Sequence, residues 1–105
     1  MDFNGLLNYM VEKKASDLFI TADVEPSIKI NGQILPIGSV KLPGPAVGQL
    51  LNSIMSEKQR KEFAETRECN FAISNPDKSA RFRVSAFQQR DQPGMVLRRI
   101  ETVIP

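Results

Sequence analysis

Apolar residues recur at helical spacing in two stretches of the chain. Near the N-terminus this spacing predicts a helix over residues 2–14, with Asp2 able to cap its start. A second helix is predicted to begin at Pro45, whose fixed φ suits a first helical turn. A third, over residues 57–65, has few apolar positions, but Ser56 and Gln59 form the pattern of a capping box. The apolar stripes of the first two helices are Phe3, Leu6, Leu7, Met10 and Val11, and Val47, Leu50, Leu51, Ile54 and Met55.

Between the first two helices, apolar and polar residues follow strand patterns. Residues 17–21 are apolar on both faces, which predicts a strand in the middle of a sheet. Asn31-Gly32 predicts a two-residue hairpin turn, because both residues accept positive φ. Pro36 lacks a backbone N–H, so the arm that follows this turn is predicted to lie at a sheet edge.

The last third of the chain alternates in the same way. Strands are predicted around residues 69–73, 81–90 and 95–100, with turns at 75–78 and 91–94. The element order is then αβββααβββ, with short connections between the later strands. This order predicts an α+β domain, with an antiparallel sheet of about six strands and helices packed on one face.

The composition narrows the chemistry that the chain can perform. Its 105 residues are 41% hydrophobic and 25% charged, which is typical of one globular domain. The sequence contains no histidine, which excludes a Ser-His-Asp triad, a Cys-His pair and an imidazole metal site. Its one cysteine, Cys69, excludes an internal disulfide and a cysteine-based zinc site. The position of Cys69 in an apolar strand pattern predicts a buried, unreactive thiol.

Two absences concern localisation. No apolar run approaches the length of a membrane-spanning helix. The N-terminus lacks the basic start and cleavage site of a signal peptide. We therefore expect a protein of the reducing cytosol.

The positive charge is concentrated in the last quarter of the chain. The whole chain carries a net charge of +2, whereas residues 81–105 carry five arginines against two acidic residues, a net charge of +3. This concentration predicts a local anionic partner. The chain itself has neither a Walker A phosphate loop nor a Gly-x-Gly-x-x-Gly motif, and it has no acid–base pair of carboxylates suited to catalysis.

The arginines fall into two pairs. Arg81 and Arg83 are two residues apart in a strand and therefore project from the same face, which suits a phosphate or a carboxylate. The alternative is a solvent-facing, salt-bridged strand. Arg98 and Arg99 are adjacent and face opposite sides of a strand, so one of them is predicted to be partly buried against a partner. Phe82 and Phe87, five residues apart, cannot form one stacking platform, which argues against RNA or other nucleic acid.

Four segments resemble a known family: residues 10–21 (MVEKKASDLFIT), 25–32 (EPSIKING), 81–87 (RFRVSAF) and 95–100 (MVLRRI). They are similar to the N-terminal domain of type IV pilus retraction ATPases, the PilT/PilU branch of the secretion ATPase superfamily. The resemblance covers the whole chain. Phe19, where PilT-like members usually carry histidine, together with residues 68–74 and 97–101, resembles PilU more than PilT.

The resemblance implies a PAS-like N-terminal domain over residues 1–105, followed in the family by a RecA-like motor domain whose motifs are absent from this sequence. We therefore expect this segment to be no enzyme and to bind no cofactor by itself, and the full-length protein to be an ATPase that uses ATP and Mg. In the family, N-terminal domains pack on neighbouring motor domains of a hexamer and bring arginines to the nucleotide phosphates. Carried over by motif, these arginines are Arg83 and Arg98, with Arg81 as a third.

The resemblance also implies partners and a location. The partners are the protein's own motor domain, neighbouring subunits of a homo-hexamer, a PilT-type paralogue and the inner-membrane pilus platform protein. The location is the cytoplasm, at the periphery of the inner membrane. Two alternatives stay open: a stand-alone PAS-like sensor of a small ligand, which needs a cavity between sheet and helices, and a general protein-interaction module.

Overall fold

The computed structural model describes residues 3–38 and 40–100, which form three helices and a six-stranded antiparallel sheet. The strand order is β3-β2-β1-β6-β5-β4, so the first three strands and the last three meet where β1 pairs with β6. The predicted α+β class and element order are confirmed. In chain order the elements are α1 (Phe3–Lys13), β1 (Asp17–Thr21), β2 (Ser27–Ile30), β3 (Gln33–Pro36), α2 (Gly44–Ile54), α3 (Glu57–Thr66), β4 (Glu68–Ser74), β5 (Arg81–Gln89) and β6 (Gln92–Ile100).

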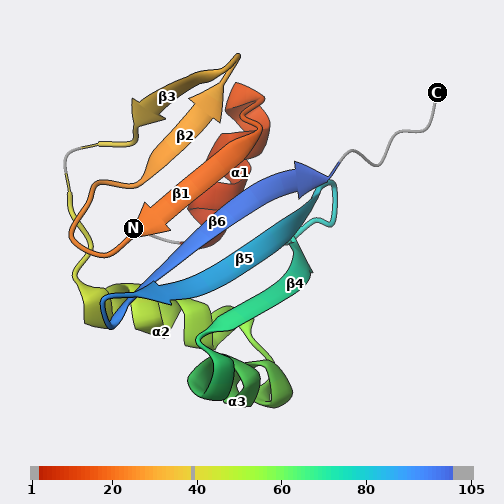
Figure 1. The fold of residues 1–105 in the computed structure, drawn as a ribbon. Helices are drawn as coiled ribbons and strands as arrows, with labels where there is room; N and C mark the ends of the chain where they lie inside the picture. The colour runs from red at the N-terminus through yellow and green to blue at the C-terminus, as the bar shows by residue number, and fades with distance from the viewer. Residues whose placement is uncertain (1–2, 39, 101–105) are drawn as a thin grey trace.

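The helices cover one face of the sheet, as Figure 1 shows. Helix α2 packs against β6 and β1, and α3 packs against β4. The residues between the two layers are almost all apolar, and several of the largest are fully buried. These include Leu7, Met10, Leu18, Ile20, Leu51, Phe82, Val84, Met95 and Leu97. The opposite face, which we call the bare face, carries no helix (Figure 1).

The helix ends agree with the predictions where the structure describes them. Gln59 donates its backbone N–H to Ser56 Oγ over 3.2 Å, and Ser56 donates its own N–H to Gln59 Oε1 over 2.9 Å, which is the predicted capping box. Pro45 lies in the first turn of α2. Helix α2 ends at Ile54, one residue before Met55, although Met55 remains buried. The predicted cap at Asp2 lies outside the described residues.

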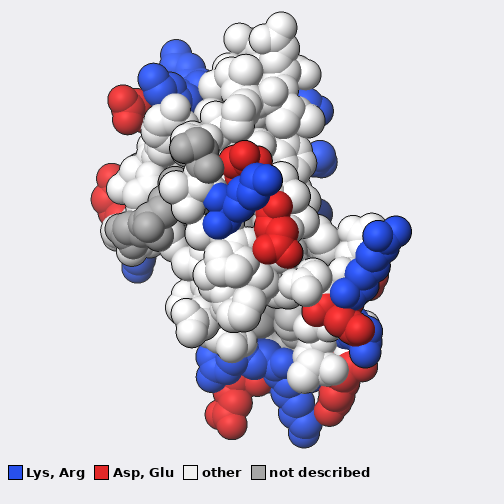
Figure 2. All heavy atoms as spheres, turned by 90° about the vertical axis from the view of Figure 1, so that its left-hand side faces the viewer, with Lys and Arg blue, Asp and Glu red and all other residues white. Residues whose placement is uncertain are grey.

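The Asn31-Gly32 hairpin is confirmed. Both residues have positive φ, 50° and 80°, and they connect the paired residues Ile30 and Gln33. As predicted, β1 lies inside the sheet and β3 at its edge. All four residues of β3 are exposed, Ile34 by 61%. Viewed from the side where β3 lies, the surface is largely uncharged (Figure 2).

The predicted turn at residues 91–94 is wrong. Strand β5 ends at Gln89 and β6 begins at Gln92, so the turn is the two residues Arg90 and Asp91, both with positive φ (54° and 62°). Pro93 lies inside β6, opposite Gln88, where the alternation of the ladder turns its nitrogen away from β5. Strand β1 ends opposite Gly94, so the missing N–H of Pro93 leaves no ladder bond unmade.

Gly94, which the Pro-Gly pattern assigns to a turn, instead has a packing role in β6. It lies directly opposite Phe87 on the bare face, and a Cβ at this position would lie 2.7 Å from the Phe87 ring. The ring therefore covers the glycine. This close approach explains why a residue without a side chain stands inside a strand.

Candidate functional site on the bare face

Four charged residues form one row across the bare face. Lys29 of β2 is paired with Asp17 of β1, Asp17 with Arg98 of β6, and Arg98 with Arg83 of β5. Directly paired residues of antiparallel strands project to the same side of a sheet. The four side chains, which we call the charged row, therefore lie next to one another although β1 and β6 are far apart in the sequence.

Arg83 and Arg98 are direct cross-strand neighbours. Counted from the tight turn, they form a hydrogen-bonded pair of the ladder, with Cα atoms about 5.5 Å apart. Both are exposed, Arg98 over 75% of its side chain. Like charges directly opposite each other destabilise a sheet. Among the described residues, no carboxylate forms an ion pair with Arg83. Arg83 therefore presents an unneutralised positive charge to solvent.

Asp17 stands on the other side of Arg98. Its side chain is only 9% exposed, and its Oδ2 accepts a hydrogen bond from Arg98 Nε over 3.4 Å. The prediction that one of Arg98 and Arg99 is partly buried is confirmed for Arg99, which is half-buried on the helix side near Val11 and Ala15. The ion pair, however, is made by the exposed arginine of the two.

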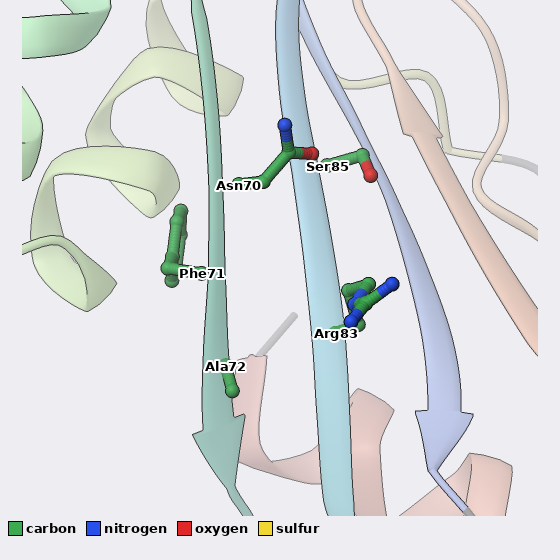
Figure 3. Close-up of a pocket in the computed structure, with 5 residues that line it drawn as sticks. All are labelled: Asn70, Phe71, Ala72, Arg83 and Ser85. Atoms are coloured by element: carbon green, nitrogen blue, oxygen red, sulfur yellow. The ribbon is translucent and has the colours of Figure 1, made fainter.

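Two shallow hollows meet at Arg83. One, of about 520 Å³, is lined by Asn70, Ala72, Arg83 and Ser85 together with the backbone side of Phe71. In Figure 3, Asn70, Arg83 and Ser85 lie on the sheet face that Phe71 turns away from. The second, of about 270 Å³, is lined by Arg83, Ser85, Val96 and Arg98. Both hollows are open and polar, which suits an anionic group presented by another surface rather than an enclosed small molecule.

Arg81 lies on the same face but outside the charged row. It is paired with Ile100 and Ser74, about 6–7 Å along the strand from Arg83. The structure thus brings Arg83 and Arg98 together and places Arg81 one position further along the face. The sequence predicted Asp17 as the first residue of a strand over residues 17–21 and not as a residue of the site. A buried-strand pattern that begins with an aspartate was the available signal.

Cys69, the other candidate for a reactive group in the chain, has a structural role. Cys69 is buried, and its burial together with the hydrogen bond and charge of Glu62 raises the pKa of the thiol to about 11. It is therefore protonated at neutral pH, as expected for an unreactive thiol.

Within residues 3–38 and 40–100, no group of three acidic, cysteine or histidine side chains could hold a metal ion. No helix in the described part of the chain is long and apolar enough to cross a membrane.

Comparison with known proteins identifies relatives of the whole chain, although no family model matches it. Over 105 residues the chain is 54% identical to the type IV pilus ATPase PilU of Pseudomonas aeruginosa, covering 100% of this chain and 27% of that protein. Over 104 residues it is 38% identical to the type IV pilus retraction ATPase PilT of the same organism, covering 99% of this chain and 30% of that protein. The chain thus spans about three tenths of the length of these relatives.

A solved structure gives the same answer for the fold. The crystal structure of the pilus retraction motor PilT with bound ADP superposes with a TM-score of 0.90 at 28% sequence identity, covering 100% of this chain and 31% of that one. The α+β architecture is therefore that of the PilT N-terminal domain. The higher identity to PilU than to PilT agrees with the resemblance found in the sequence. The chain belongs to the PilT/PilU family of type IV pilus ATPases and corresponds to their N-terminal domain.

Proposed function

We propose that this chain is the assembly and regulatory domain of a hexameric pilus retraction ATPase that powers twitching motility. In this proposal it packs on the motor domain of a neighbouring subunit and presents Arg83 and Arg98 to the nucleotide phosphates bound there, with Arg81 beside them. One observation carries the proposal. Two exposed guanidinium groups stand side by side on a sheet face without helices, in a chain that has no phosphate loop.

The chemistry of the two side chains fits this role. A guanidinium group keeps its charge, binds phosphate oxygens through two parallel N–H groups, and stabilises the charge of a transferring phosphoryl group. In this proposal ATP and Mg are bound by the motor domain, which this sequence does not include. The remaining proposed partners are a PilT-type paralogue and the inner-membrane pilus platform protein, reached from the cytoplasmic side of the membrane.

Alanine variants of the full-length ATPase test the role of the arginines. We expect Arg83→Ala and Arg98→Ala to lower steady-state ATP hydrolysis by roughly 10- to 1000-fold, at or below the range of arginine fingers. Arg90→Ala is the matched control, because Arg90 is exposed in the turn that joins the same two strands. Normal activity in both of the first two variants contradicts the proposal.

Mixed hexamers test whether the arginines act on a neighbouring subunit. One population carries Arg83→Ala and an intact motor domain, and the other carries wild-type Arg83 and an inactivated motor domain. Each population alone is expected to be nearly inactive, whereas hexamers assembled from both should regain measurable hydrolysis. If mixing restores nothing although mixed hexamers form, the arginines do not act across the subunit boundary.

The 105-residue chain alone provides a further test. We expect it to hydrolyse no ATP and to bind ATP weakly, because it lacks a phosphate loop. Isothermal titration calorimetry that gave micromolar affinity would contradict this. Such an affinity would instead favour the small-ligand sensor. The core gives that alternative no support, because fully buried side chains such as Phe82 and Met95 occupy it.

A further inference from the structure

The strongest unassigned feature of the bare face is the carboxylate of Asp17. Aspartate is rarely buried unless it is paired, yet only 6% of Asp17 is exposed. The backbone around it is held on both sides. Ser16 donates its N–H to the carbonyl of Lys29 over 2.9 Å, and its own carbonyl accepts the N–H of Arg99 over 3.0 Å. The start of β1 is therefore fixed between β2 and β6, and Asp17 is fixed with it.

Both oxygens of this carboxylate are engaged. Oδ1 accepts a hydrogen bond from the Ser16 hydroxyl over 2.6 Å, and Oδ2 accepts one from Arg98 Nε over 3.4 Å. The bond to Arg98 uses Nε and leaves the two terminal amino groups of the guanidinium free of Asp17. With 75% of the Arg98 side chain exposed, those two groups remain available for a bidentate anion.

Asp17 also affects the electrostatic repulsion between the two arginines. Along the charged row the signs run positive, negative, positive, positive, from Lys29 through Asp17 and Arg98 to Arg83. Asp17 thus attracts Arg98 from the side opposite to Arg83 and offsets part of the repulsion between them. No carboxylate among the described residues does the same for Arg83.

We propose that Asp17 is a positioning residue: it holds Arg98 by its Nε so that the terminal amino groups meet the phosphates, while Arg83 acts as an unrestrained cation. This inference rests on the proposed function of the two arginines. It makes them chemically unequal. Lysine can supply a charge but cannot bind Asp17 and a phosphate at the same time through one planar group. Arg83→Lys should therefore retain more activity than Arg98→Lys.

A double-mutant cycle in the full-length ATPase tests the proposal. We expect Asp17→Asn, which keeps the shape of the side chain, to lower kcat by about 10-fold, as misplacement of a reacting group does. In the background of Arg98→Ala the same substitution should have no further effect. Asp23→Asn is the matched control, because Asp23 is an exposed aspartate in the loop after the same strand. Thermal melts verify that each variant is folded.

A readout independent of activity is the NMR signal of the Arg98 Nε–H in the 105-residue chain. We expect its hydrogen exchange to be slower than that of the Arg83 Nε–H, and the difference to vanish in Asp17→Asn. If the two exchange equally fast in the wild-type chain, the proposal is overturned. If Asp17→Asn does not fold, ATP hydrolysis by Arg98→Lys and Arg83→Lys in the full-length ATPase tests the proposal from the side of Arg98, and equal activities overturn it.

The outcomes separate this proposal from the function on which it rests. If Arg98→Ala leaves ATP hydrolysis unchanged, the proposed function fails for Arg98, whatever Asp17 does. If Arg98→Ala lowers hydrolysis but Asp17→Asn does not, the proposed function stands and the positioning role is overturned. A loss from Asp17→Asn that is equally large in the Arg98→Ala background also overturns the positioning role, since it shows that Asp17 acts through the fold.

Discussion

The two faces of the sheet are built from the same strands, but they are used differently. In β5, Phe82 and Val84 are fully buried under the helices, whereas Arg83 between them is exposed on the bare face. Because side chains alternate along a strand, one segment can stabilise the core with every second residue and leave the others to a partner. An exposed bare-face residue such as Arg83 is therefore available to a partner, whereas Asp17 with Arg98, and Phe87 over Gly94, are tied into the fold.

Phe82 and Arg83 are adjacent in β5 but lie on opposite faces, so their substitutions should differ most in their effect on stability. We expect Phe82→Ala to lower the free energy of unfolding by about 3–5 kcal/mol, because it leaves a cavity in a fully packed core. Its neighbour Arg83→Ala should change it by at most about 0.5 kcal/mol, as for an exposed side chain. Urea denaturation of the 105-residue chain measures both. A large loss in Arg83→Ala would mean that this arginine is structural.

Cys69 tests whether a titratable group on the covered face behaves as a core residue. Folding raises the pKa of its thiol from 9.0 to about 11, so between these values the unfolded chain releases the proton and the folded chain keeps it. The free energy of unfolding should therefore fall as pH rises from 9 to 11, by roughly 2 kcal/mol from this thiol. Cys69→Ala should lack this part of the decrease, and Glu62→Gln should reduce it. Denaturation curves across this pH range are the measurement.

The distinction between a covered face and a bare face does not hold for the edge strand β3, because β3 is exposed on both sides. Its stability depends on the turn that aligns it with β2. We expect Gly32→Val to cost about 1–2 kcal/mol, because a β-branched residue at a φ of 80° is strained. Gly32→Asn, which tolerates positive φ better, should cost less. An unchanged melting temperature in Gly32→Val would show that the hairpin contributes little to the fold.

The smallest expected effect distinguishes the two arginines of the bare face. We expect Arg98→Ala to cost about 1 kcal/mol of unfolding free energy, because it leaves the buried Asp17 carboxylate with the Ser16 hydroxyl alone. This is more than the loss expected from Arg83→Ala. Combining Arg98→Ala with Asp17→Asn should recover part of the loss. Equal stability of the two single variants would contradict a structural tie between Asp17 and Arg98.

Local patterns were enough to predict much of this molecule. The alternation over residues 81–90 predicted the strand β5, and the Asn31-Gly32 pair predicted a real turn. Both depend on residues close in the sequence. The turn at Arg90 and Asp91 was missed because arginine rarely adopts positive φ, whereas Pro93-Gly94 is a strong turn signal that drew the predicted turn along the chain. In the structure, an ion pair of 2.9 Å joins Arg67 to Asp91, and β5 and β6 are paired with each other right up to the turn.

The candidate site shows the same limit. The shared face of Arg81 and Arg83 follows from their spacing, but the meeting of Asp17 with Arg98 depends on β1 lying beside β6. Such pairing brings together residues from opposite ends of the chain. No local pattern encodes it, because strand order is decided by how the helices and hairpins pack as a whole.

The tight turn at Arg90 and Asp91 also limits how the chain can change in length. Arg83 and Arg98 are equally distant from this turn along the two arms, and this symmetry sets them opposite each other. An extra residue within either arm would reverse the side on which its arginine emerges, and two extra residues would restore the side but displace the charge by about 6–7 Å. A longer loop that keeps Gln89 opposite Gln92 would disturb neither arginine. We therefore expect insertions and deletions among homologues to gather at the tip of this hairpin and to be absent from its arms.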